Sequence, residues 1–137
     1  MFEFHGWFVI SETTYDYDIG GLDSIITDLR LMLAQADWPS GFAEIRALNG
    51  MYFLHMAGYT NRPIHYHDTL AIILTFLAKR TPGSYGLLYW RDDEDHSPPG
   101  MNNFHVDVLA RGNITTRFDP FLSPTVPTIE EKDEPLF

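Results

Sequence analysis

Residues 43–57 read AEIRALNGMYFLHMA, in which two apolar-rich stretches flank the dipeptide Asn49–Gly50. Asn-Gly is favoured in two-residue β-hairpin turns, because both turn positions need a positive φ. The spacing therefore predicts an antiparallel hairpin centred on Asn49–Gly50. An antiparallel sheet is the framework that the neighbouring segments have to join.

Two segments show helical periodicity. In residues 22–36, apolar side chains recur at spacings of three and four residues, which predicts a helix with one buried stripe. Residues 68–80 show the same pattern and are followed by Pro82–Gly83, which predicts a second one-sided helix. Each helix needs a sheet to cover, because only one of its faces is apolar.

The remaining apolar segments have the length and pattern of strands. They are residues 2–13, 85–91, 104–111 and 114–118. In residues 104–111, Phe104 and Val106 fall on one face, whereas His105 and Asp107 fall on the other. Gly112–Asn113 predicts a tight turn between the last two strands.

These elements predict an α+β fold class, with a mainly antiparallel sheet and two helices packed on one face. The opposite sheet face would carry the polar half of each strand and is a candidate working surface. Residues 119–137 contain four prolines, which exclude an interior strand or a helix. We expect this irregular segment to lie over the surface, anchored by Phe121, Leu122 and Ile129. Residues 1–137 are expected to form a single domain.

The composition is strongly acidic, with nineteen Asp and Glu against nine Lys and Arg and a net charge of −10. Nucleic acids and anionic membranes bind concentrated Lys and Arg, so neither is an expected partner. A basic protein suits the charge better, because opposite fields speed association, although acidity can equally serve solubility alone. The absence of cysteine excludes thiol chemistry and fits a cytoplasmic location, as do the lack of a signal peptide and of a membrane-spanning run.

Motifs for metals and nucleophiles are missing. A calcium loop starting at Asp93 would place Pro98 where glycine is needed and Phe104 where a bidentate glutamate is needed. His65 and His67 lack zinc-site spacing and suit a solvated loop before a helix. No nucleophile elbow or phosphate-binding glycine loop occurs either. We therefore predict no cofactor and no metal, leaving a metal-dependent binding module as a minor alternative.

An acid–base site is the alternative that the sequence leaves open. His5, His105 and Asp107 are expected on the open sheet face, where they could converge with Arg46 or Arg117. A histidine beside a carboxylate is a usable catalytic pair. The alternative function is therefore a small hydrolase-like enzyme that uses His5, His105 and Asp107.

The most charged stretch is RDDEDH, residues 91–96, which follows the aromatic run SYGLLYW. Consecutive like charges repel, so we expect an exposed loop, which has no function in the simplest interpretation. In the functional interpretation, the loop contacts a cationic partner, with the aromatic side chain of Trp90 as an anchor. The predicted contacts are Trp90, Asp92, Asp93, Glu94 and Asp95, followed by Glu130 and Glu131 of the acidic tail.

Three further stretches occur in order along nearly the whole chain: FHGWFVI at 4–10, PGSYGLLY at 82–89, and RG at 111–112 leading to DPFLSPTVPTIEE at 119–131. Together they resemble the immunity protein 7 family of bacterial polymorphic toxin systems. The resemblance implies an α+β domain that binds a cognate toxin domain and blocks it in the cytoplasm, without catalytic residues. The family's shared Trp7 and Gly86 suit packing and turn roles, so the resemblance does not locate the toxin interface.

The charge and the resemblance agree on one function. Many such toxins are nucleases, whose clefts are cationic because they bind nucleic acid. We therefore predict a non-enzymatic immunity protein that neutralises a basic toxin domain, more specifically a nuclease, by stoichiometric binding. Its toxin contacts would be the residues of the RDDEDH loop, Trp90 and the acidic tail.

Overall fold

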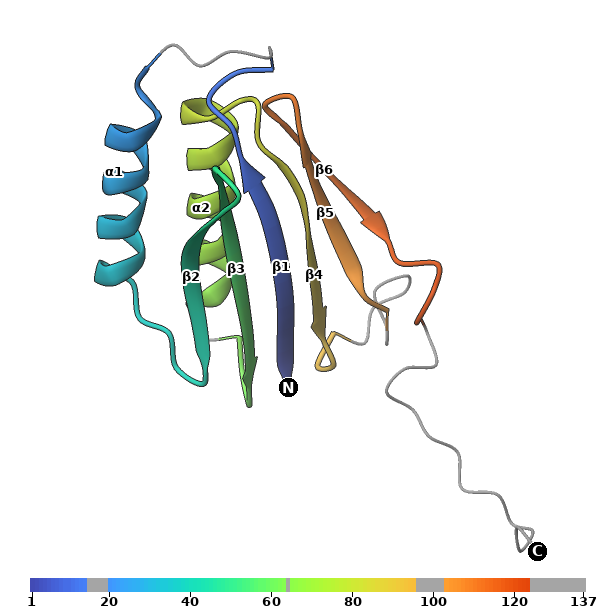
Figure 1. Ribbon diagram of the computed structural model, residues 1–137. Helices are drawn as coiled ribbons and strands as arrows, with labels where there is room; N and C mark the ends of the chain where they lie inside the picture. Colours follow the sequence, from blue (N-terminus) through green and yellow to red (C-terminus); the bar gives the residue numbers. More distant parts are fainter. Residues whose placement is uncertain (15–19, 64, 96–102, 124–137) are drawn as a thin grey trace, which may run out of the picture.

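The computed structural model describes residues 1–14, 20–63, 65–95 and 103–123, which form a six-stranded sheet and two helices (Figure 1). The strands are β1 (Phe2–Ile10), β2 (Gly41–Leu48), β3 (Met51–Thr60), β4 (Tyr85–Asp92), β5 (His105–Ala110) and β6 (Asn113–Phe118). The helices are α1 (Leu22–Gln35) and α2 (Tyr66–Arg80). Neighbouring strands are antiparallel throughout, in the order β2-β3-β1-β4-β5-β6. The predicted α+β class is confirmed.

Both tight hairpins have left-handed turn residues. At the β2–β3 turn, Asn49 and Gly50 have φ angles of 51° and 81°, as the Asn-Gly pair predicts. The β5–β6 turn was predicted at Gly112–Asn113, but it is formed by Arg111 and Gly112, with φ angles of 51° and 75°. Asn113 instead pairs with Ala110 as the first residue of β6. The prediction was one residue late, because the glycine takes the second turn position and not the first.

The two helices lie on the same side of the sheet (Figure 1). Their buried stripes and the helix-facing strand residues form one hydrophobic cluster. From the strands it includes Phe2, Phe4, Phe8, Ile10, Ile45, Leu54, Met56, Leu88 and Leu109, and from the helices Ile26, Leu29, Leu33, Tyr66, Leu70, Ile73, Leu74 and Leu77. In the part of the chain that the structure describes, neither helix is long and apolar enough to cross a membrane.

Alternate side chains of β1 point to the two faces of the sheet. Phe4 is fully buried on the helix-facing side, whereas His5 and Trp7 are exposed on the open side. In the register, Phe4 lies opposite Trp90 of β4, and His5 lies opposite Tyr89. Since directly paired residues share a face, Trp90 faces the helices.

The helix layer is narrower than the sheet. Two helices packed about 10 Å apart cover a width of about 20 Å. Six strands spaced about 4.8 Å apart span about 24 Å between the outer backbones alone. The outer strand β6 is exposed along its whole length, although α2 comes close to both β5 and β6.

The pairing of β5 with β4 corrects the predicted orientation of β5. His105 and Asp107 were expected on the open face, but their partners Trp90 and Leu88 place them on the helix-facing side. Val106 takes the open side and is still only 7% exposed. The register with β4 decides the orientation, because a period-two pattern does not say which of its two faces is covered.

The segment after β6 is held by a polar residue. Asp119 is 3% exposed, and its Oδ2 accepts hydrogen bonds from the backbone N–H groups of Leu122 (2.7 Å) and Ser123 (3.2 Å). The predicted anchors Phe121 and Leu122 are 82% and 46% exposed, so that prediction was wrong. Ile129 lies outside the described residues. A carboxylate that satisfies turn N–H groups fixes this segment without burying its apolar side chains.

Candidate functional site

The acidic turn, consisting of Asp92, Asp93, Glu94 and Asp95, begins at the last residue of β4 and is tied to the start of the chain. The amino group of Met1 forms an ion pair with Asp93 Oδ1, and the Asp93 N–H donates to the Met1 carbonyl (3.1 Å). Asp92 Oδ1 accepts the Glu94 N–H at 3.0 Å. Glu94 is the most exposed member. These bonds order the backbone of the turn and leave Glu94 directed at solvent. His96, Glu130 and Glu131 lie outside the described residues.

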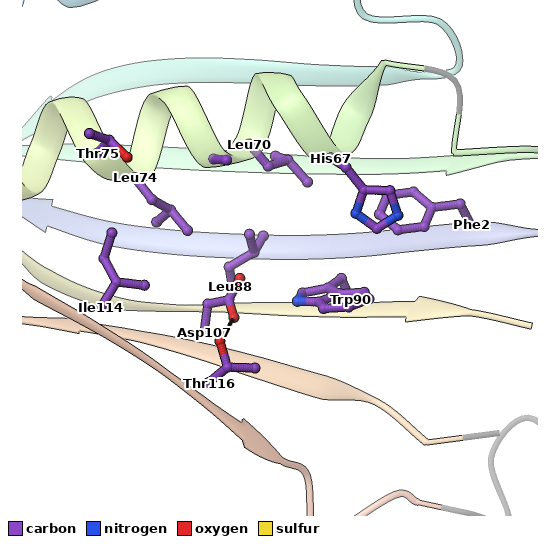
Figure 2. Close-up of a pocket in the computed structure, with 11 residues that line it drawn as sticks. Phe2, His67, Leu70, Leu74, Thr75, Leu88, Trp90, Asp107, Ile114 and Thr116 are labelled. Atoms are coloured by element: carbon purple, nitrogen blue, oxygen red, sulfur yellow. Dashed lines mark hydrogen bonds between the residues drawn. The ribbon is translucent and has the colours of Figure 1, made fainter. Parts of the chain in front are cut away.

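Trp90 lines a groove between α2 and strands β4 to β6, which we call the Trp90 groove (Figure 2). Its volume is about 290 Å³. The walls are mainly apolar, with a few polar side chains among them. The lining residues are Phe2, His67, Leu70, Ala71, Leu74, Thr75, Leu88, Trp90, Asp107, Ile114 and Thr116. The groove lies where α2 faces β4, β5 and β6.

Stacked rings form one end of the groove. The rings of Trp90 and His105 are nearly parallel, with centroids 4.0 Å apart and an interplanar angle of 7°. His67, from the first turn of α2, meets Trp90 edge-on at 5.4 Å and Phe2 at 4.8 Å. These contacts hold the Trp90 indole in one orientation from two sides.

Burial lowers the pKa of His105 below its ordinary value of 6.5. The charges of Asp95 and Asp107 act in the opposite direction, and His67 adds to the lowering. His105 is therefore mainly neutral at pH 7 and stacks on Trp90 as a neutral ring. Asp95 of the acidic turn and Asp107 of the groove thus both act on the same imidazole.

The lowered pKa predicts a pH-dependent loss of stability. Between the lowered pKa and 6.5, the unfolded chain binds more protons at His105 than the folded chain, so stability falls as the pH falls. The stabilisation is complete above pH 6.5 and is lost progressively towards the lowered pKa. We expect the melting temperature to drop between about pH 7.5 and about pH 5.5, and to drop less in His105→Phe, which keeps the stack but cannot titrate. An equal drop in both proteins would contradict the assignment.

Asp107 is the carboxylate of the groove. Its Oδ1 accepts a 2.7 Å hydrogen bond from the Thr116 hydroxyl on the neighbouring strand (Figure 2). The lining contains neither Lys nor Arg among the described residues. The structure thus brings together the predicted Trp90 and acidic turn, and adds Asp107 and His67. Neither was predicted as a contact, because their place in the groove depends on strand register and on the position of α2.

The proposed acid–base constellation is not assembled. His5 lies on the open face and contacts Glu3 (Nε2–Oε2, 2.8 Å), whereas His105 and Asp107 lie on the helix-facing side. Arg46 belongs to the edge strand β2 and pairs with Glu44 at 3.1 Å. The expectation that these side chains converge was wrong, because the sheet backbone separates them. Within the described ranges, no three His, Asp or Glu residues lie close enough to hold a metal ion.

The open sheet face is the second surface with the character of an interface. Neither α1 nor α2 covers this face (Figure 1), and it exposes large apolar side chains. They include Trp7, Phe42, Leu48, Met51, Tyr59 and Tyr85. Trp7 and Tyr85 meet edge-to-face with ring centroids 6.4 Å apart. Exposed apolar patches of this kind mark protein–protein contacts, and two pairs of polar side chains, His5–Glu3 and Arg46–Glu44, lie on the same face.

Comparison with known proteins gives one result. Residues 1–131 match the model of a protein family described as Immunity protein 7. The curated proteins and the solved structures give no match.

Proposed function

Because the chain belongs to the immunity protein 7 family and is thus an immunity protein against a toxin, we propose that it neutralises its cognate toxin domain by one-to-one binding. No chemical step is required of such an inhibitor. It needs a surface that competes with the substrate of the toxin or blocks its motion. The toxin is a basic domain, more specifically a nuclease, and the complex forms in the cytoplasm.

One observation supports a basic partner. The acidic turn begins two residues after Trp90 at the end of β4, so the exposed Glu94 carboxylate and the apolar groove with its aromatic wall are joined by one strand. This pairing is typical of protein interfaces, where Trp supplies binding energy and surrounding charges steer the encounter. Nucleic-acid-binding clefts carry concentrated Lys and Arg. The carboxylates of the turn would therefore occupy positions that phosphates take in the toxin's substrate.

The direct test uses the protein encoded beside this chain. Its C-terminal domain is co-expressed with this protein, and we expect a one-to-one complex and restored growth of cells that carry the toxin. A nuclease activity of that domain should be lost on mixing at equimolar ratio. If the domain neither binds nor is neutralised, the proposed mode of action is wrong.

The contribution of the acidic turn is tested by charge reversal. We expect Glu94→Lys/Asp95→Lys to slow association with the toxin about tenfold and to weaken the salt dependence of the rate. The matched control is Asp23→Lys/Asp37→Lys, which changes the net charge equally; Asp23 lies in the first turn of α1 and Asp37 just after the helix. Association rates measured by surface plasmon resonance at two salt concentrations distinguish the two pairs.

Two outcomes would contradict the role of the turn. Equal slowing in both double variants would show that only the overall charge matters. The second outcome is an unchanged association rate in both double variants together with weak toxin binding by the variant Trp7→Ser/Tyr85→Ser. That result would place the interface on the open sheet face. Neither outcome would alter the proposal that the protein is a stoichiometric inhibitor.

A further inference from the structure

The Trp90 groove has the dimensions of a site for a single side chain. Its volume of about 290 Å³ lies at the lower limit of small-molecule sites, which span about 300–1,000 Å³. Apolar residues form most of its lining, and Asp107 is the carboxylate among them. A side chain with a long apolar stem and a positively charged tip would match both the apolar lining and the Asp107 carboxylate.

We propose that the Trp90 groove receives one arginine side chain of the toxin, with its guanidinium paired to Asp107. The inference rests on the proposed function and deepens it, because it names the residue type that the partner inserts. The methylene groups of the arginine pack on Leu74, Leu88 and Ile114. The charged tip reaches Asp107 at the β5–β6 side of the groove (Figure 2).

Asp107 retains the capacity to bind a cation. Thr116 donates to Oδ1, and a carboxylate has about four acceptor positions on its two oxygens. The same bond fixes the orientation of the carboxylate. Arginine suits this position better than lysine, because its planar fork can bind a carboxylate through two N–H groups and it is more weakly hydrated.

The charges around the groove argue against other occupants. An apolar side chain would remove water from the Asp107 carboxylate without replacing its hydrogen bonds, which is unfavourable. An anion in the groove would face the Asp107 carboxylate, with neither Lys nor Arg among the described lining residues to offset it. Residues 124–137 of this chain carry four carboxylates and one lysine, so like charges disfavour them as well. His105 faces Trp90 and is mainly neutral at pH 7, so it does not compete as a cation.

The test does not depend on identifying the toxin. The protein labelled with ¹⁵N-tryptophan gives indole N–H signals for its three tryptophans, of which Trp90 is assigned by Trp90→Phe. Nα-acetyl-arginine amide is titrated in, with the neutral citrulline analogue and the lysine analogue as matched probes. We expect a saturable shift of the Trp90 signal with a dissociation constant of about 1 mM, the range for a fragment of this size.

The citrulline analogue should bind at least tenfold more weakly, and Asp107→Asn should weaken arginine binding by the same factor. Asp37→Asn, which removes a carboxylate outside the groove, should have no effect. Unchanged Trp7 and Trp38 signals would show that Asp107→Asn is folded. The proposal is overturned if the Trp90 signal does not shift at an arginine amide concentration ten times the expected dissociation constant. It is also overturned if the citrulline analogue shifts the Trp90 signal equally, or if the lysine analogue binds as tightly as the arginine amide.

The two proposals fail in different ways. If arginine amide binds the groove but no toxin domain is captured, stoichiometric toxin inhibition is wrong and the arginine site stands. If the toxin binds tightly and Asp107→Asn leaves its affinity unchanged, the inhibitor function stands and the arginine site is wrong.

Discussion

Replacing Phe4 by alanine is expected to lower the free energy of unfolding by about 3–5 kcal/mol, the usual cost of deleting a buried phenyl ring. Phe4 is fully buried in the centre of the sheet. Its ring lies 4.6 Å from that of Tyr66 and 6.5 Å from that of Trp38, between centroids. Alanine would leave a cavity where β1, α2 and the segment after α1 meet. The total free energy of unfolding of a natural domain is about 5–15 kcal/mol, so a loss of this size is severe.

Urea denaturation measures this effect. The urea concentration at the unfolding midpoint should fall, while the slope of the free energy of unfolding against urea concentration stays the same. Phe4→Leu is the milder companion, and it remains measurable if Phe4→Ala does not fold. Phe121→Ala is the matched control, because the ring of Phe121 is 82% exposed. A loss of less than about 1 kcal/mol for Phe4→Ala would contradict the central position of the ring.

The second large effect is expected at Gly58, which lies directly opposite Phe4 in the β1–β3 register. A Cβ atom at Gly58 would lie 2.3 Å from Cε1 of the Phe4 ring. Gly58→Ala therefore has to displace a fully buried ring, and we expect it to cost about 2–3 kcal/mol as overpacking. The glycine is needed here for space, because it lets the ring lie flat against β3.

A double-mutant cycle tests this explanation. In the Phe4→Leu background, Gly58→Ala should cost less than half of what it costs in the wild type, because the clashing ring atoms are gone. Gly6→Ala is the control on the same face, where the nearest atoms are the flexible side-chain ends of Leu88 and Met56 at 3.1–3.3 Å. Equal costs of Gly58→Ala in both backgrounds would place the strain in the backbone instead.

Much of the fold could be predicted from local signals. The β2–β3 hairpin could be predicted from Asn49–Gly50, because Asn and Gly adopt the positive φ of such a turn more readily than other residues do. The helical stripes gave α1 and α2 to within two residues at their ends, because spacing alone defines an apolar helix face. The anchors at Phe121 and Leu122 were wrong, because burial depends on what covers a side chain and not on its polarity.

The candidate site was predictable only in part. Trp90 and the acidic turn are adjacent in sequence, so their proximity follows from the chain itself. Asp107 and His67 come from β5 and α2, and only the pairing of β4 with β5 and the position of α2 bring them to Trp90. The same pairing separates His5 from His105, which removes the predicted acid–base constellation.

By itself, the sequence determined the antiparallel framework, the one-sided helices, the acidic charge and, through its motifs, the family. Tertiary structure decided which face of β5 turns towards the helices and where a groove remains open. The reason is geometric: alternation of period two defines which side chains share a face, but the register and the position of the helices decide which face is covered. For that reason the Trp90 groove, and Asp107 within it, became visible only in the folded chain.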